Sequence, residues 1–456
     1  MRLSALALAT LLVLSLAPAP VGAADGAAQQ TPDCAGRMAQ QPDSLTVVSV
    51  QGANGSQKTA ARVVAFEPNG SIRWVHRNGR ELGVSWSYDI DPLPNGNLFV
   101  TAAYRENGTG KTLLYELDRE TGERVETERL EMVDTHDADV LNESHVVVAN
   151  MRNYDAANET NEDRIVVYNR SSDEVVWEWR FADHYDESVG GDYEEDWSHV
   201  NDVDAVGEHY FLVSPRNFDQ VVLVDRRTGD IALTLGSHGD HDVLETQHNP
   251  DYLAGPGGAP TFLVADSEND RIVEYAFRDG DWERTWRAGS GETLYWPRDA
   301  DRLPNGNTLV GDSRNSRVLE VTPDGEVVWE LFAPYLVYDV ERLPGDGSNG
   351  PTIAEQNESG AVELSNASPP SEQRLSTCAA AISTHEGGWE TSTASPNGTV
   401  TATASATEAT TTETPTHETV NEDALETDAS TVSAPLSPVP ALAALALVGL
   451  LLARRQ

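Results

Sequence analysis

Residues 298–307 read RDADRLPNGN, and residues 88–97 read YDIDPLPNGN. Shorter versions of this phrase begin at four other positions: His136, Asn201, His248 and Tyr338. The six copies start 40 to 65 residues apart. Self-similarity at a spacing of this size is typical of proteins built from repeated supersecondary units. The phrase therefore predicts a repeat architecture with six units.

Each phrase is followed by the sequence pattern of a β-sheet. An alternating apolar run comes directly after each phrase, at 97–104, 145–152, 209–216, 261–267, 307–313 and 351–356. Most repeats then have a third run, a short turn with Gly, such as DRETGE at 118–123, and a fourth run. Four short strands per repeat, joined by tight Gly turns, are typical of β-propeller blades. No window shows a long helical period, so the pattern predicts an all-β, six-bladed β-propeller.

The ring needs a closing blade made from both ends of the repeat region. The runs ARVVAF (61–66) and SIRWVH (71–76) precede the first phrase and have no inner pair, whereas the last phrase has an inner pair and no convincing outer one. We expect these four strands to form one mixed blade, which removes two exposed sheet edges. Cys34 and Cys378 lie just outside this region. They are either two unpaired thiols or a disulfide that clamps the ring.

The composition is strongly acidic. The chain has 456 residues, with 74 Asp and Glu against 31 Lys and Arg, and a net charge of -43. A surface of this sign excludes binding to nucleic acid phosphates. Lys58 and Lys111 are the two lysines of the chain, and so acidic a surface stays soluble in high salt, where charge repulsion is screened. We therefore expect a protein from a halophile.

The two ends of the chain differ from the repeat region. Residues 1–23 resemble a secretory signal peptide, and 24–45 form an N-terminal flank before the propeller at 46–366. Residues 367–435 are rich in Thr, Ser and Glu and predict a disordered stalk. Residues 436–456 are a hydrophobic segment that ends in two arginines, which favours a membrane anchor or a sorting segment.

The C-terminal segment resembles the sorting signals of haloarchaeal surface proteins, although it lacks their Pro-Gly-Phe triplet. The C-terminal segment is therefore either cleaved during sorting or retained as a membrane helix. Either predicts an exported protein, tethered to the membrane at the cell surface. Nine N-x-Ser/Thr sequons fit an exported glycoprotein, at Asn54, Asn69, Asn107, Asn142, Asn158, Asn169, Asn357, Asn366 and Asn397.

The first residue of each phrase, which we call the leader, is placed at one end of the central channel if the phrase is the innermost strand. The leaders are Tyr88, His136, Asn201, His248, Arg298 and Tyr338. His199 lies two residues before a leader and on the same side of the strand. The loops after the second strands bring arginines to this face: Arg105, Arg152, Arg216 and Arg314.

A comparison of the six repeats distinguishes positions with a structural role from positions that could form a site. The second position is Asp in five of six phrases and the fourth is acidic in all six, so we expect these carboxylates to bind backbone N–H groups of neighbouring strands. The leader position varies among His, Arg, Asn and Tyr. Imidazole and guanidinium groups that converge in an acidic protein suit a small oxyanion such as a sulfate or phosphate ester.

Several segments resemble the PAPS-independent aryl-sulfate sulfotransferase family: DWSHVNDV (196–203), SPRN (214–217), QHNP (247–250) and DRIVEY (270–275). The resemblance covers about residues 60–360 and is strongest over 196–275. It implies a six-bladed propeller that carries a sulfuryl group from an aryl sulfate to a phenol through a transient sulfohistidine. It implies no cofactor and no metal.

The resemblance also assigns residues. His199 and His248 match active-site histidines of the family, Arg216 matches an arginine in the following loop, and Arg271 matches a family Arg-x-Val-Glu-Tyr segment. The phrase at Arg298 lacks a further histidine that the family has. We therefore take as candidate catalytic residues His136, His199 and His248. The candidate substrate-binding residues are Asn201, Arg216, Arg271, Arg298 and Arg314.

Two other functions stay open. One is a noncatalytic surface propeller that binds a ligand or partner. The other is a metal-dependent enzyme, since two loop insertions hold His184, His238, Asp240, His241 and Asp242. We expect packing between blades for the outer-strand tryptophans, Trp177, Trp179, Trp282, Trp286 and Trp329. Trp197 and Trp296 are candidates to flank an aromatic substrate. The sequence gives no indication of the oligomeric state.

Overall fold

The computed structural model describes residues 32–54, 57–58, 61–77, 82–106, 109–194, 196–345, 347–367 and 371–389. The predicted signal peptide and the C-terminal hydrophobic segment lie outside these residues. So does residue 390 onward, which includes most of the predicted stalk. Over the described part of the chain, no helix is both long and apolar enough to span a membrane.

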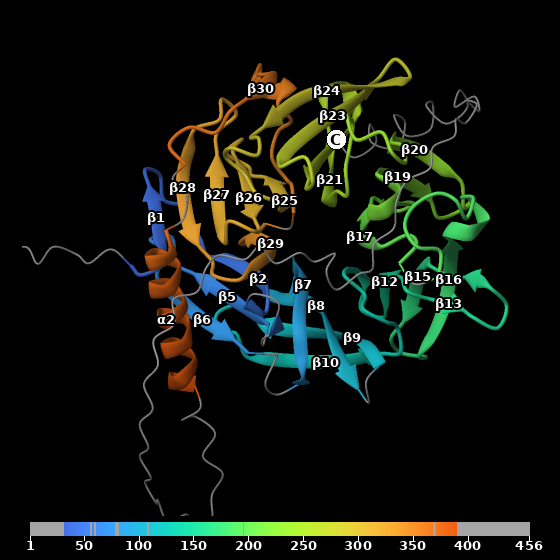
Figure 1. Ribbon diagram of the computed structural model, residues 1–456, viewed down its shortest axis with the longest axis horizontal. Coiled ribbons are helices and arrows are strands. Elements are labelled where there is room, and N and C mark those ends of the chain that lie inside the picture. The colour runs from blue at the N-terminus through green and yellow to red at the C-terminus, as the bar shows by residue number, and fades with distance from the viewer. Residues whose placement is uncertain are drawn as a thin grey trace, which may run out of the picture. The chain divides into compact units, whose positions relative to one another are not determined.

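Six β-sheets stand in a ring, as Figure 1 shows, so the predicted β-propeller is confirmed. The innermost strands carry the phrases: β7 (Val84–Pro92), β11 (Ala138–Asn142), β17 (Val200–Val206), β21 (His248–Ala254), β25 (Pro297–Arg302) and β29 (Leu336–Arg342). The strands that follow alternate in direction, and their bounds are β8 (Asn97–Glu106), β9 (Thr109–Asp118) and β10 (Arg124–Leu130) in blade one; β12 (His145–Asn150), β15 (Arg164–Asn169) and β16 (Glu174–Arg180) in blade two; β18 (Tyr210–Pro215), β19 (Gln220–Asp225) and β20 (Ile231–Gly236) in blade three.

Blades four and five each include one added strand at the outer edge, and the closing blade has four strands. Blade four holds β22 (Pro260–Asp266), β23 (Arg271–Arg278), β24 (Asp281–Ala288) and the parallel β30 (Gly360–Val362); blade five holds β26 (Thr308–Asp312), β27 (Arg317–Val321), β28 (Val327–Phe332) and β1 (Ala35–Met38); the closing blade holds β2 (Thr46–Gln51), β5 (Arg62–Phe66) and β6 (Ile72–His76). Two small hairpins are β3 (Ala53–Asn54) with β4 (Gln57–Lys58) and β13 (Tyr154–Asp155) with β14 (Thr160–Asn161). Short 3-10 helices are η1 (Phe181–Asp183), η2 (Arg216–Phe218), η3 (Pro256–Gly258) and η4 (Ala354–Gln356).

The closing blade is mixed, as predicted, but its composition differs from the prediction. Three of its strands come from the N-terminal side and β29 alone from the C-terminal side. The run 351–356, which we expected to be a strand, contains η4 instead. The strand β2 takes its place between β29 and β5. Its sequence TVVSVQ is rich in β-branched residues and is buried throughout, whereas 351–356 begins with a proline that has no N–H for a ladder.

The tryptophans of the outer strands fasten each blade to a neighbour. The indole N–H of Trp179 donates to the carbonyl of Gly229 at 2.9 Å, and that of Trp286 donates to Pro323 at 3.0 Å. Equivalent cross-blade bonds run from Trp74 to Arg119, from Trp282 to Thr234 and from Trp329 to Pro68. Trp177 packs on Phe211 of blade three, with ring centroids 5.4 Å apart. The predicted packing role is confirmed for all five tryptophans named for it.

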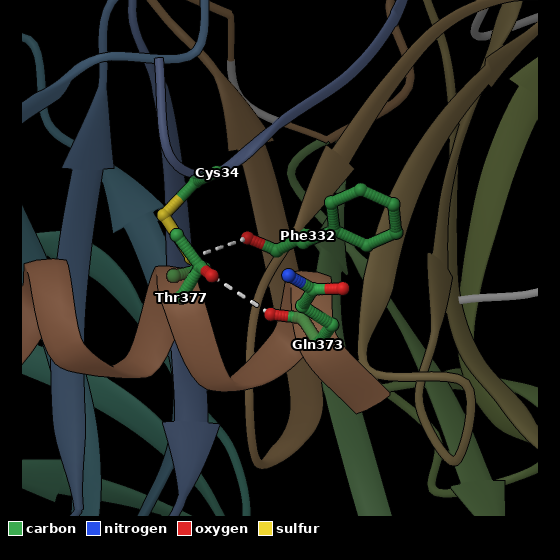
Figure 2. The surroundings of a disulfide bond; sticks show 5 residues. Cys34, Phe332, Gln373 and Thr377 are labelled. Atoms are coloured by element: carbon green, nitrogen blue, oxygen red, sulfur yellow. Dashed lines mark hydrogen bonds between the residues drawn. A yellow bond between two sulfur atoms is a disulfide. The ribbon is translucent and has the colours of Figure 1, made fainter. Parts of the chain in front are cut away.

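A disulfide joins Cys34, next to β1, to Cys378 in helix α2 (Glu372–Trp389), as Figure 2 shows. The predicted clamp is therefore present. The helix lies inside 367–435, which we expected to be disordered, so that expectation is wrong for residues 372–389. Cys378 and Ile382 are buried one helical turn apart in the core that β28 and β5 share. Because these few apolar residues pack and are covalently tied, the polar composition of the segment is overridden.

Candidate active site

The ring of blades brings the aromatic leaders into one stack. Tyr88 lies on His136 with ring centroids 4.0 Å apart, and His136 meets His199 edge-on at 5.0 Å. Tyr338 has edge contacts with both His136 and His248, at 5.8 and 6.1 Å. Its hydroxyl lies 3.4 Å from Nδ1 of His136. The three histidines are at most 4% exposed, so three imidazoles from three blades share one buried space.

Arg298 is held from several sides. Its Nε donates to the hydroxyl of Ser313 at 3.0 Å, and its Nη1 donates to the side-chain carbonyl of Gln51 at 2.8 Å. The guanidinium lies over the rings of Trp296 and Tyr338, at 4.4 and 5.0 Å. These contacts span blade five and the closing blade. They fix a permanent positive charge beside the aromatic stack.

The remaining predicted residues of this face lie close by. Arg314 stacks on Trp296 with 4.2 Å between guanidinium carbon and ring centroid. The side-chain amide of Asn201 donates to the backbone carbonyl of Gln247 at 2.9 Å, and the backbone carbonyl of Asn201 accepts from the hydroxyl of Tyr338 at 3.2 Å. These two contacts join blade three to blade four and to the closing blade, whereas the side-chain oxygen of Asn201 has no hydrogen-bond partner among the described residues.

For four of the leaders, the residue two positions earlier in the chain has a left-handed backbone conformation. These residues are Asp134, His199, Thr246 and Trp296, with φ between 39° and 54°. Such a conformation costs a side-chain-bearing residue roughly 1 kcal/mol or more. Next to His199, Ser198 holds the turn, because its N–H and its hydroxyl both donate to Asp163, at 3.2 and 2.7 Å. Through these turns, the side chains of His199 and Trp296 also contact leaders: His199 contacts His136, and Trp296 contacts Arg298.

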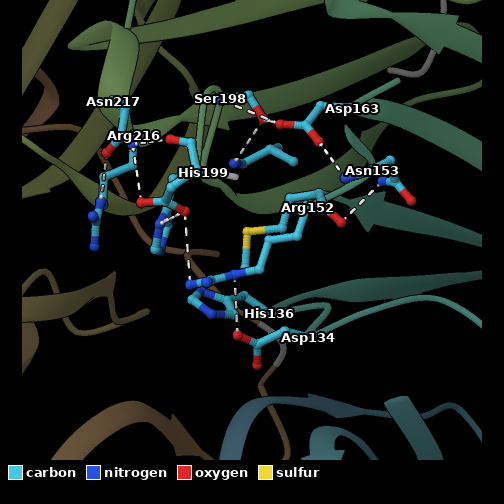
Figure 3. A network of polar contacts seen from close by, with 12 residues as sticks. Asp134, His136, Arg152, Asn153, Asp163, Ser198, His199, Arg216 and Asn217 are labelled. Carbon is cyan, nitrogen blue, oxygen red and sulfur yellow. Dashed lines mark hydrogen bonds and ion pairs between the residues drawn. The ribbon is translucent and has the colours of Figure 1, made fainter. Parts of the chain in front are cut away.

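A charged network covers His136 and His199, as Figure 3 shows. Nδ1 of His199 donates to Asp196 at 2.8 Å. The guanidinium of Arg152 lies 3.7 Å from Asp196 and 3.3 Å from Asp134. Asp134 in turn accepts from the hydroxyl of Tyr88 at 2.7 Å. This chain of contacts fixes the orientation of the His199 ring and places a guanidinium beside His136.

Arg216 belongs to the same network through its neighbour. Its Nε donates to the side chain of Asn217 at 3.1 Å, and Asn217 donates to the backbone carbonyl of Asp196 at 2.6 Å. Burial raises the pKa of Asp196, but the charges of His199, Arg216 and Arg152 outweigh it and hold the pKa below its usual range. Asp196 therefore remains a carboxylate, which is the state that orients His199.

The protonation of His248 follows from a repeated contact. In blade five, Arg298 can only donate to the hydroxyl of Ser313, which donates its own proton to the carbonyl of Val337 at 2.5 Å. In blade four, Ser267 occupies the same place: its hydroxyl donates to the carbonyl of Pro297 at 2.7 Å and lies 2.8 Å from Nδ1 of His248. Nδ1 is therefore the donor, and the lone pair of the neutral ring is on Nε2.

The imidazoles of His136 and His248 are kept neutral. Burial lowers the pKa of His248 well below its usual value, and the charges of Arg298, Arg216 and His199 lower it further. Burial also lowers the pKa of His136 well below its usual value, and the charges of His199, Arg152 and Arg216 lower it further. Burial also raises the pKa of the Tyr88 and Tyr338 hydroxyls. The site therefore combines the neutral imidazoles of His136 and His248 with fixed guanidinium charges, which suits binding of an anionic group next to a nitrogen nucleophile.

The arylsulfotransferase (ASST) family model matches residues 34–248. This match supports the family that the sequence resembles. The matched segment runs from the first cysteine to His248 and includes His136, His199 and Arg216. It supports aryl sulfotransferase activity in general. No curated protein matches the chain.

The chain is also similar in structure to other solved proteins. One is a protein of unknown function from Bacteroides caccae, with 13% identity, 65% of this chain and 97% of that chain covered, and a TM-score of 0.43. Another is a putative 6-phosphogluconolactonase from Bacteroides fragilis, with 12% identity, 66% and 98% covered, and a TM-score of 0.40. A third is virginiamycin B lyase from Staphylococcus aureus, with 10% identity, 63% and 84% covered, and a TM-score of 0.37.

One candidate of the arylsulfotransferase resemblance is not beside the histidines. Arg271 begins β23, the third strand of its blade, where its Nε donates to Asp266 at 2.6 Å and its Nη2 donates to two backbone carbonyls of the preceding loop. Blade five repeats this arrangement: Arg317 donates to Asp312 at 2.7 Å. The repeated spacing Asp-Ser-x-Asn-x-Arg in 266–271 and 312–317 was the signal for a structural pair.

The residues considered for a metal site have other partners in the structure. His184 stacks on Trp179 with centroids 4.4 Å apart. His238 and His241 approach Asp219, at 3.7 and 3.5 Å, rather than Asp240 and Asp242. Trp197, a candidate to flank substrate, is instead buried in the core between blades two and three. Trp296 does border the site.

Sequence reasoning missed the residues that orient the site. Asp134, Asp196, Ser267, Ser313 and Gln51 were not selected, although each binds a leader or a neighbour of one. Two signals could have found some of them. Asp134 stands two positions before a leader, as His199 does, and the serines follow Asp at the end of the second strand in both blades four and five.

Proposed function

We propose that this protein transfers a sulfuryl group from an aryl sulfate to a phenol, with His248 as the nucleophile. The observation that carries the proposal is the convergence of His136, His199 and His248 beside Arg298 within one buried space. The family match over residues 34–248 supports the same class of reaction. No cofactor is needed, because the donor already carries the group that is transferred.

The first step forms a sulfohistidine. The lone pair on Nε2 of His248 attacks the sulfur of the aryl sulfate, an N–S bond forms, and the bond between sulfur and the phenolic oxygen breaks with its electron pair on oxygen. The leaving phenolate takes a proton from an imidazolium, for which His199 is placed by its contact with Asp196. Arg298 and Arg216 lower the energy of the transition state through the sulfuryl oxygens.

The second step returns the enzyme to its first state. An acceptor phenol gives its proton to His199, its oxygen attacks the sulfur, and the N–S bond to His248 breaks. The burial of His248, 1% exposed, supports transfer over hydrolysis, since water is kept from the intermediate. Arg152 and Arg216 are partly exposed, and we expect their side chains to turn toward the sulfate when the donor enters.

The reaction scheme predicts ping-pong kinetics. With a nitrophenyl sulfate as donor and a phenol as acceptor, double-reciprocal plots at several acceptor concentrations should be parallel. Incubation of the protein with 35S-labelled donor and no acceptor should leave one label per chain, stable to base and released by acid. Release of nitrophenol without a stable label and with intersecting plots would contradict the covalent route. Absence of any nitrophenol release in high salt would contradict the activity itself.

The pH dependence should reflect the lowered pKa of His248. The nucleophile must be neutral, and a pKa below the usual 6.5 keeps it neutral to lower pH. The acid limb of kcat/KM should therefore fall below pH 6.5. Arg298→Gln should move this limb toward 6.5, because one of the charges that lowers the pKa is removed, whereas Arg298→Lys should leave it in place. A limb at or above 6.5 in the wild-type protein would contradict neutral His248 as the nucleophile.

The location of the reaction is part of the proposal. The sequence features of residues 1–23 and 436–456 favour export and attachment to the membrane at the cell surface. The net charge of -43 supports a protein that works in high salt, and the subtype that we propose is haloarchaeal. Donors and acceptors at the cell surface would be small phenols and their sulfate esters.

A further inference from the structure

Below the leaders, the acidic positions of the phrases line the axis of the ring and follow a bonding rule. At Asp137 and Asp299, the carboxylate of the second position accepts from the backbone N–H of the third position in the next blade. Asp137 accepts in this way from Val203, and Asp299 from Val340 at 3.0 Å. The framework role that the repeats predict is therefore confirmed at these positions. Each bond ties two neighbouring blades at the axis.

Asp202 breaks this rule for a chemical reason. The third position of the next phrase is Pro250, and proline has no backbone N–H to donate. Asp202 is 6% exposed, and its Oδ1 has no hydrogen-bond partner among the described residues. An unpaired buried carboxylate is costly, because the group loses its hydration without a replacement. Oδ1 of Asp202 therefore has no partner among the described residues, because blade four has Pro250 at the position where the next blade would supply a backbone N–H.

Two other carboxylates are close to the orphaned one. One oxygen each of Asp137, Asp202 and Asp204 lies within 4.8 Å of the other two. Two oxygens bound to one Ca²⁺ at about 2.4 Å are at most about 4.8 Å apart. A divalent cation would offset both the lost hydration of Asp202 and the repulsion among three carboxylates at this distance.

We infer that the axis of the propeller holds one Ca²⁺ ion, bound by Asp137, Asp202 and Asp204. The group consists of carboxylates alone, which are hard ligands that favour Ca²⁺ over zinc or copper. Asp137 comes from blade two, and Asp202 and Asp204 come from β17 in blade three. The ion therefore replaces the missing backbone bond by joining two blades. This site is separate from the sulfuryl-transfer proposal and has no step in it.

The test measures calcium directly in the full chain. The protein is treated with EDTA, dialysed into metal-free buffer with 1 M NaCl, which screens binding to the acidic surface, and then titrated with Ca²⁺. We expect one bound Ca²⁺ per chain by mass spectrometry of the metal content. We also expect the midpoint of thermal unfolding to be several degrees higher in Ca²⁺ than in EDTA.

Two variants locate the ion. Asp202→Asn should lose the bound Ca²⁺ and the difference in midpoint between Ca²⁺ and EDTA. Asp299→Asn is the matched control, because this residue has the same phrase position and burial but lies outside the group of three, and it should keep both. If Asp202→Asn does not fold, Asp204→Asn takes its place.

Three results would overturn the inference. The first is a wild-type protein that retains no Ca²⁺ and unfolds at one temperature in Ca²⁺ and in EDTA. The second is an Asp202→Asn protein that binds Ca²⁺ as the wild type does. The third is a midpoint of thermal unfolding that rises as much with Mg²⁺ as with Ca²⁺, which would show that the site is not specific for calcium. None of these readouts depends on sulfuryl transfer, so the two proposals fail separately.

Discussion

His248→Ala should lower kcat for sulfuryl transfer by about 10⁴-fold or more, because removal of a covalent nucleophile leaves only binding and electrostatic contributions. The 35S label that forms without acceptor should disappear with it. Nδ1 of His248 is occupied by Ser267, so the variant loses both the reacting Nε2 and the contact that orients it. The loss of kcat is measured by nitrophenol release from nitrophenyl sulfate in high salt. The loss of the label is measured by counting the 35S that stays bound to the denatured protein.

The control variants separate chemistry from folding. His248→Gln keeps a side-chain amide for Ser267 and should be equally inactive, since an amide is no nucleophile. His145→Ala removes an imidazole of β12 that contacts Asn142 and Asn169 away from the leaders, and should keep full activity. A labelled and active His248→Ala protein would contradict the assignment. Retention of the label in that variant, together with its loss in His199→Ala, would move the nucleophile to His199.

The double substitution Cys34→Ser/Cys378→Ser should destabilise the folded chain by about 5 kcal/mol. The bridge closes a loop of 344 residues, and a long closed loop removes much of the entropy of the unfolded chain. It also holds α2 against β6 and β28. The midpoint of thermal unfolding, followed by circular dichroism, should fall by on the order of 10 °C.

The reduced wild-type protein provides the comparison. A phosphine reductant should lower its midpoint to that of the double variant and should leave the double variant unchanged. Neither cysteine contacts a leader, so kcat/KM well below the unfolding temperature should be retained. Equal midpoints for the oxidised wild type and the double variant would show that the clamp does not contribute to stability.

The fold was predictable because the repeat is local. Every phrase carries its own alternation and its own Gly turn, so the number of blades and the innermost position of strands such as β7 and β25 followed from the sequence. The exceptions are segments whose partners are distant. The strand β2 displaced 351–356 in the closing blade, and α2 is held by a cysteine 344 residues away. Neither choice is visible in the composition of the segment itself.

The sequence was sufficient to predict which histidines and which arginine of the leaders belong to the candidate site. The varying leaders indicated His136, His248 and Arg298, and the structure brings these side chains together. The partners that set protonation and orientation were not predictable in the same way. Ser267 was found only through its hydrogen bonds, and Arg271 was separated from the site only by its pairing with Asp266.

The sequence by itself determined six repeats, an acidic chain and a set of chemically distinct leaders. These properties depend on residue order and composition, which need no partner in space. The tertiary structure alone decided which nitrogen of His248 carries the lone pair and which arginines face it. It also decided that Pro250 leaves Asp202 without a donor. Such properties depend on contacts between residues far apart in the chain, as between Gln51 and Arg298, and only closure of the ring creates those contacts.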